Sequence, residues 1–167
     1  MLTSRMVVAA ALLCSVLQGK DANLEFGYWA EHKIGSWVKV KMEIETENVK
    51  VSSQLTHTLT EAGGDRVLVE RKSKTTVNGQ EQPEKTVMQE LLRDKDKDPV
   101  KIEKEGEEEV EVAGKKLKCR RVEGSQGESK VKLWLSKEIP GGVAKGEISG
   151  GQFPATMKVS ALAWEKK

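Results

Sequence analysis

Large aromatic side chains are scarce in this sequence, whose 167 residues include four tryptophans, two phenylalanines and one tyrosine. So few rings provide little bulk for filling a closed hydrophobic core. Hydrophobic residues make up 37% of the chain and charged residues 32%, which is polar for a folded protein but not typical of a disordered one. We therefore expect a folded protein with a thin core.

Cysteine and histidine are also scarce, with two residues of each. Cys14 belongs to an N-terminal segment that we expect to be cleaved, so the mature chain would keep Cys119 alone and form no intramolecular disulfide. A lone thiol of this kind is most often a small buried hydrophobe, which we expect for Cys119. His32 and His57 lie far apart and provide no zinc-ligand spacing, so neither a metal nor a cofactor is predicted.

Long hydrophobic runs are missing too. The longest uncharged run, Met6 to Leu17, is far shorter than the roughly 20 residues of a membrane span. It follows Arg5 and precedes small or polar residues, which is typical of a secretory signal peptide, whereas a buried helix is the alternative. We expect residues 1–22 to be this signal, with a cleavage site that no small-x-small motif fixes. Residues 23–167 would then form a single secreted or periplasmic β-rich domain without a transmembrane segment.

Charge of one sign is not in excess. Lys and Arg total 28 against 26 Asp and Glu, a formal charge of +2 that excludes a dominantly electrostatic binder of polyanions. The basic residues of segment 115–121 follow the acidic run 107–111 and lie near no aromatic stacking platform. No nucleic-acid partner is predicted.

Catalytic motifs are also absent. The sequence has no G-x-S-x-G nucleophile elbow, and Gly114-Lys115 lacks both the earlier glycine and the Ser or Thr of a phosphate-binding loop. Acidic residues in segment 94–105 have the spacing of a calcium loop, but Pro99 stands where the sharp turn needs glycine. We expect a protein that is not an enzyme.

Alternating hydrophobicity is the dominant pattern in the rest of the chain. Apolar and charged residues alternate from Trp37 to Glu45, as in a strand with one buried face. Segment 84–92 fits either a strand or a helix, and its extended neighbours favour the strand. The expected strands are 37–45, 49–61, 66–77, 84–92, two arms within 107–121, 131–136, 143–148 and 156–164, the last with Met157, Val159, Ala161 and Ala163 on one face. They predict a mainly β fold, a strongly curved antiparallel sheet or partial barrel of eight to nine strands.

The hairpin within 107–121 has a predictable register, because it is acidic before Ala113-Gly114 and basic after it. A turn at these two residues sets three opposite-charge pairs across the strands and puts Val110 opposite Leu117. A two-residue turn and a four-residue loop give the same register. The charge pairs predicted are Glu111 with Lys116, Glu109 with Lys118, and Glu107 with Arg120.

Four of the seven aromatic residues lie between Phe26 and Trp37. Phe26, Trp29 and Lys33 have helical spacing, so we expect one short N-terminal helix over 24–33, ended by Gly35.

Three segments together resemble a known group of proteins. These are Gly35-Ser36-Trp37-Val38, the hairpin segment 113–119, and Leu133-Trp134-Leu135-Ser136 followed by Ile139-Pro140-Gly141-Gly142-Val143. Over residues 35–164 the chain is similar to small exported bacterial β-proteins of the LolA-like and TapB-like periplasmic type. The resemblance implies an open curved sheet that holds an apolar ligand or partner in its concavity, often against a helix.

Two functions are compatible with these observations. In the first, the sheet binds an apolar molecule or an extended peptide, with Val40, Met42, Leu55, Leu59 and Leu133 as candidate lining residues. The same residues could instead be core beneath the helix. In the second, the protein is a structural or interaction module of the cell envelope that acts through an edge strand or the aromatic segment. His57, on the apolar face of 49–61, is either a hydrogen-bonded core histidine or a polar group in a pocket.

Overall fold

The structure, a computed structural model, describes residues 18–19, 22–94, 100–151 and 153–167. The predicted signal peptide falls almost entirely outside these residues, as does most of the acidic stretch at 94–98. The elements in chain order are β1 (Gln18–Gly19), β2 (Ala22–Asn23), α2 (Leu24–Ala30), β3 (Trp37–Glu45), β4 (Lys50–Gly63), β5 (Arg66–Val77), β6 (Gln80–Glu81), β7 (Lys85–Leu92), β8 (Lys101–Val112), β9 (Lys115–Gln126), β10 (Ser129–Leu135), β11 (Val143–Gly150) and β12 (Phe153–Glu165).

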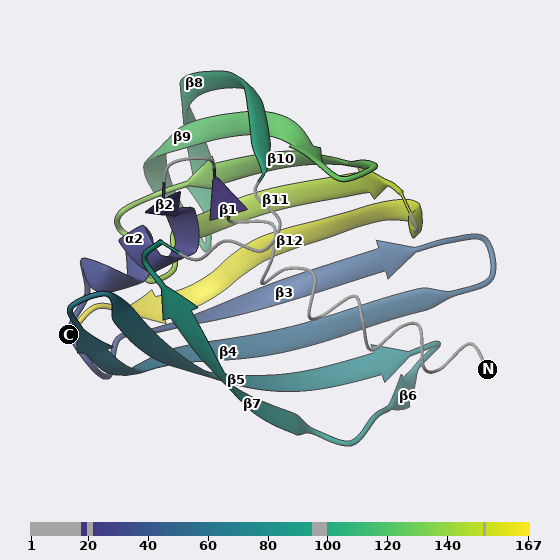
Figure 1. Cartoon of the computed structure of the whole chain (residues 1–167). Coiled ribbons are helices and arrows are strands. Elements are labelled where there is room, and N and C mark those ends of the chain that lie inside the picture. Colours follow the sequence, from purple (N-terminus) through teal and green to yellow (C-terminus); the bar gives the residue numbers. More distant parts are fainter. Residues whose placement is uncertain (1–17, 20–21, 95–99, 152) are drawn as a thin grey trace.

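Ten of these strands form one antiparallel sheet, which confirms the predicted mainly β fold. Its order is β6-β5-β4-β3-β12-β11-β10-β9-β8, and β7 also pairs with β5. The sheet is strongly curved but not closed, with β8 and β9 arching above β10 to β12 and α2 at one end (Figure 1). The strand that was not among those expected is the short β6. It follows a tight turn at Asn78-Gly79, where both residues have positive φ.

One face of the sheet, the inner face, carries the core and packs against helix α2. It bears Val38 and Val40 on β3, His57 on β4 and Arg71 on β5, each at alternating positions. Residues directly opposite in a ladder point to the same face, so the strand register extends this face across the sheet. A continuous apolar row, the inner row, crosses six strands and comprises Val131, Ile148, Met157, Ile44, Val51 and Val77.

A β-bulge on β12 changes which residue reaches the inner face near the C-terminus. The register shifts between Ala161 and Ala163, so Ala163 lies opposite Lys39 and Trp164 lies opposite Val38. The prediction that Ala163 continues the face of Met157, Val159 and Ala161 is therefore wrong. The extra residue of the bulge, Leu162, is exposed.

The β8–β9 hairpin has the predicted register. Glu111, Glu109 and Glu107 lie opposite Lys116, Lys118 and Arg120, and Val110 lies opposite Leu117. Ala113 and Gly114 both have positive φ, at 51° and 74°, as a two-residue type I′ turn requires. The ion pairs on this face are diagonal instead of direct, joining Lys116 to Glu109 at 3.7 Å and Arg120 to Glu105 at 2.8 Å. Diagonal neighbours are within reach of such long side chains.

Helix α2 is shorter than the expected 24–33 and ends at Ala30. The reason lies in the backbone beyond it. Gly35 N donates to Leu59 O at 2.8 Å, and Leu59 N donates to Ser36 O at 3.0 Å. These bonds extend the strand pairing of β3 and β4 beyond its first pair, Trp37 with Thr58, so the chain must leave the helix before residue 35.

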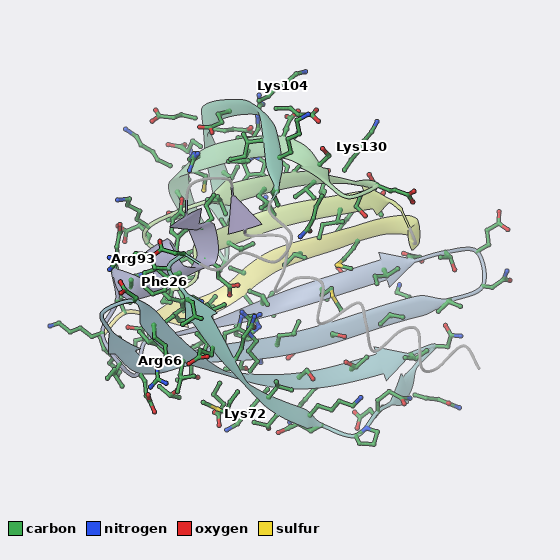
Figure 2. All side chains as sticks on the ribbon, in the orientation of Figure 1. Phe26, Arg66, Lys72, Arg93, Lys104 and Lys130 are labelled. Carbon is green, nitrogen blue, oxygen red and sulfur yellow. The ribbon has the colours of Figure 1, made fainter. Side chains whose placement is uncertain are left out.

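The aromatic rings of α2 pack against a glycine loop between β10 and β11. Trp29 is fully buried, and its ring atoms lie 2.9 Å from the point where a Cβ on Gly141 would stand. Tyr28 comes even closer to the corresponding point of Gly142. Phe26, beside Arg93 in Figure 2, has the Arg93 guanidinium 5.5 Å from its ring centroid. The two glycines therefore allow the helix to approach the loop.

This contact predicts unequal costs for two glycine substitutions. Gly141→Ala and Gly79→Ala both place a side chain at positive φ, +77° and +82°, which costs about 1–2 kcal/mol. Only Gly141→Ala also collides with the Trp29 ring, so we expect it to lower the free energy of unfolding by at least about 1 kcal/mol more. Urea denaturation of both variants measures the difference. Equal losses would show that the Trp29–Gly141 contact is not tight.

Candidate functional site

Three charged or polar side chains meet where helix α2 lies on the sheet. Glu25 of α2, Arg71 of β5 and His57 of β4 are 2%, 7% and 9% exposed. His57 and Arg71 are directly opposite in the β4–β5 ladder. Arg71 Nη2 donates to Glu25 Oε1, and Trp29 Nε1 donates to the same oxygen at 3.3 Å. The cluster thus attaches the helix to the inner face.

The surroundings change how these groups titrate. Burial raises the pKa of the Glu25 carboxyl, against the opposing effects of Arg71 and the Trp29 hydrogen bond. Burial lowers the pKa of His57 well below its ordinary value, and the Arg71 charge adds to this effect. His57 is therefore neutral at neutral pH.

Glu25 Oε2 and His57 Nε2 in this cluster are buried and have no hydrogen-bond partner. Both residues line a cavity of about 30 Å³, which we call the helix-end cavity. A cavity needs only about 10–15 Å³ to hold one water molecule, so this one has room for a small polar group. The rest of the lining is Arg71 with Val38, Val40, Pro140, Gly141, Val143 and Val159.

The opposite end of the sheet contains a much larger open hollow. The β12–β3 ladder runs only as far as the pair Met157 and Ile44, while β12 begins four residues earlier, at Phe153. A hollow of about 1210 Å³, the open-end hollow, lies here. Its lining is residues 43–51 with Glu147, Ala155, Thr156 and Lys158. The inner-row residues Ile44 and Val51 take part in this lining, together with the charged residues Glu43, Lys158 and Glu147, which lie opposite one another on the other face of the sheet.

The five predicted lining residues all lie on the inner face. Val40 is opposite Leu55 in the β3–β4 ladder, and Met42 connects through Val159 and Gly146 to Leu133. Every one of the five, including Leu59, is 4% exposed or less and belongs to the hydrophobic core. Val40 also lines the helix-end cavity. The structure thus brings these residues together on one buried face.

Neither Glu25 nor Arg71 was predicted from the sequence as a functional residue. Arg71 continues the alternation of Val67 and Val69 on β5, so a charged side chain at an inward position was a usable signal. Glu25 carries no such signal, because α2 is a short helix with a glycine in its middle. His57 was placed correctly on the apolar face, and its buried Nε2 fits a polar group in a pocket better than a fully hydrogen-bonded core residue.

Cys119 is a free, buried cysteine, as expected. Burial raises the pKa of its thiol, so the reactive thiolate is disfavoured at neutral pH. Among the described residues, no cluster of three or more His, Cys, Asp or Glu side chains is arranged to hold a metal ion. Within the same residues, no helix has the length and apolar character needed to cross a membrane.

Comparison with protein-family models finds none that matches this chain, and a search of curated proteins finds no significant match. The resemblance to LolA-like and TapB-like domains therefore stays a prediction.

The titration of His57 predicts a pH-dependent stability. Its pKa is lower in the folded than in the unfolded protein, so the unfolded state binds more protons below the ordinary value of about 6.5. Neutral His57 therefore stabilises the fold fully above about pH 6.5. As the pH falls below this value, the free energy of unfolding decreases by up to about 1.4 kcal/mol per pH unit. Glu25, with a raised pKa, has the opposite sign, losing stabilisation as the pH rises.

Replacing His57 with glutamine isolates the histidine contribution. Between about pH 7 and 5, we expect the free energy of unfolding to fall less steeply in His57→Gln than in the unaltered protein. His32→Gln is the matched control. His32 is only half-buried and its pKa is lowered less than that of His57, so its replacement should change the slope less. Chemical denaturation at several pH values gives the slopes. An unchanged slope in His57→Gln would contradict a buried, neutral His57.

Proposed function

We propose that this protein is an exported, non-enzymatic carrier that binds an apolar chain on the inner face of its curved sheet. The observation that carries the proposal is the inner row, an unbroken line of apolar side chains across six strands that reaches the open-end hollow through Ile44 and Val51. The apolar run Met6 to Leu17 supports export, and the LolA-like resemblance supports carriage.

The dimensions of the row suit a long, thin ligand. Six strands spaced about 4.8 Å apart make the row roughly 24 Å long. Its members are aliphatic, so they favour a hydrocarbon chain over a flat aromatic molecule. Glu45, Glu47 and Lys50 on the rim of the open-end hollow keep the entrance hydrated. An amphiphile can thus insert its chain while the entrance stays in water.

The unclosed sheet gives such a chain a way in. The row members other than Val77 are buried, so a ligand must separate packed side chains to reach them. In the described part of the chain no ladder joins β8 to β7, so the two edges can move apart without breaking strand pairing. A closed barrel would have to break hydrogen bonds for the same motion.

Dye binding tests the carrier directly. A neutral naphthylamine dye that fluoresces in apolar surroundings should bind the purified protein. The double substitution Ile44→Thr and Val51→Thr puts hydroxyls in the inner row. Val51→Thr keeps the side-chain shape, and Ile44→Thr removes one carbon. We expect it to weaken dye binding roughly tenfold, because burying a hydroxyl costs on the order of 1–3 kcal/mol.

Ser52→Thr is the matched control, since Ser52 neighbours Val51 but points to the opposite face. It should leave the dye affinity unchanged, and circular dichroism should show all variants folded. Absence of dye binding to the unaltered protein at saturating concentration would refute the carrier.

A second candidate, an interaction module of the cell envelope, is favoured by the edge strand β7. Val87 and Met88 are 58% and 51% exposed there, and β7 pairs only with β5 among the described strands. Exposed apolar side chains on an edge strand are typical of strand-addition sites. A photo-crosslinker at Val87, applied in the host, should then give one discrete protein adduct that a crosslinker at the exposed Lys130 does not. Identical patterns at both positions would dismiss this candidate.

A further inference from the structure

We infer that the helix-end cavity binds a hydroxyl group at the end of the carried chain, so that the ligand is a neutral, hydroxyl-bearing amphiphile. The inference rests on the proposed carrier function and adds the chemical class of the ligand. Its basis is the pair of buried, unpartnered atoms Glu25 Oε2 and His57 Nε2, whose residues line one cavity.

The position of the cavity connects it to the proposed binding face. Val40 and Val159, which line the cavity, are inner-face residues. Val40 lies opposite Leu55, and Val159 lies opposite Met42. The inner row crosses β3 at Ile44, and the cavity lies further along the same strand. A hydrocarbon chain that leaves the row at Ile44 and continues along the strands over Met42 and Leu55 therefore ends beside the cavity, and its terminal group is the part that can enter.

The two unpartnered atoms select the kind of terminal group. Glu25 Oε2 accepts a hydrogen bond, and the nitrogen of a neutral imidazole either donates or accepts. A hydroxyl satisfies both atoms when it donates its one hydrogen to Glu25 Oε2 and accepts a hydrogen bond from the Nε2–H tautomer of His57. An alkyl end leaves both without partners, which is costly in a buried site.

Charged terminal groups fit the site poorly. A carboxylate or phosphate would place a second anion beside the Glu25 carboxylate, and an ammonium would approach the Arg71 guanidinium. Burial would add a desolvation cost for either ion. The volume of about 30 Å³ also excludes a phosphate or a sugar, but it accommodates a hydroxyl, which is close to water in size.

Competition between probes with the same chain tests the inference on the unaltered protein. Decanol, its methyl ether, decane, decanoate and decylammonium are each used to displace the naphthylamine dye. We expect decanol to displace the dye at a concentration several-fold to roughly tenfold lower than the other four, the range that net hydrogen bonds of about 1 kcal/mol produce. The ether matters most, because it keeps the oxygen but cannot donate to Glu25.

Paired histidine variants then assign the preference to the cavity. His57→Leu removes Nε2 and should abolish most of the advantage of decanol over decane. His32→Leu, which alters the half-buried histidine outside the cavity, should retain that advantage. If His57→Leu does not fold, the comparison of decanol with its ether still decides the question.

The outcomes separate the inference from the function it rests on. Equal displacement by decanol, its ether and decane would overturn the hydroxyl site while the carrier stands. Preference for decanoate or decylammonium would also overturn the hydroxyl site, because the cavity would then recognise a charged group. Failure of every probe and of the dye to bind would instead overturn the carrier itself.

Discussion

The buried ion pair between Glu25 and Arg71 holds helix α2 against the inner face of the sheet. Two charges taken out of water gain little over a well-packed apolar pair, but removing one of them leaves the other charge buried without this ion-pair partner, at a cost of up to about 3–5 kcal/mol. The pair therefore fixes where the helix lies. With the helix in place, Trp29 reaches Gly141 and Glu25 lines the helix-end cavity at one end of the curved sheet, while the open-end hollow remains at the other.

The two edges of the sheet are built differently. On β8, five glutamates at alternating positions, from Glu103 to Glu111, are exposed, and such a charged edge resists pairing with a foreign strand. On β7, Val87 and Met88 are exposed instead. The pairing of β3 with β12 places segments from the two ends of the chain in the middle of the sheet, so both edges belong to the internal strands β5 to β9. An open sheet with one protected edge would suit the proposed carrier, which has to admit a ligand.

Alternation of apolar and polar residues predicted most of the sheet. It predicted the bounds of 37–45 and 66–77, and charge complementarity predicted the register of the β8–β9 hairpin. These signals are local, because strand pleating and a two-residue turn act over a few residues. The bulge at Ala161–Ala163 was not predictable in this way, since its effect depends on the partner strand β3.

The candidate site was only half predictable. The buried face that holds the five candidate lining residues follows from the alternation, and His57 stood out as a polar residue on an apolar face. The contact of Glu25 with Arg71 joins residues 46 positions apart, and the cavity needs α2, β4, β5 and the glycine loop together. No local sequence pattern predicts these long-range contacts, because they depend on how the sheet curves.

Native mass spectrometry of the mature protein purified from its own host tests the central claim most directly. We expect a non-covalent added mass that disappears on denaturation and that fragments as a neutral, hydroxyl-bearing amphiphile. A bare chain, or a complex with another polypeptide alone, would contradict the carrier and favour the interaction module.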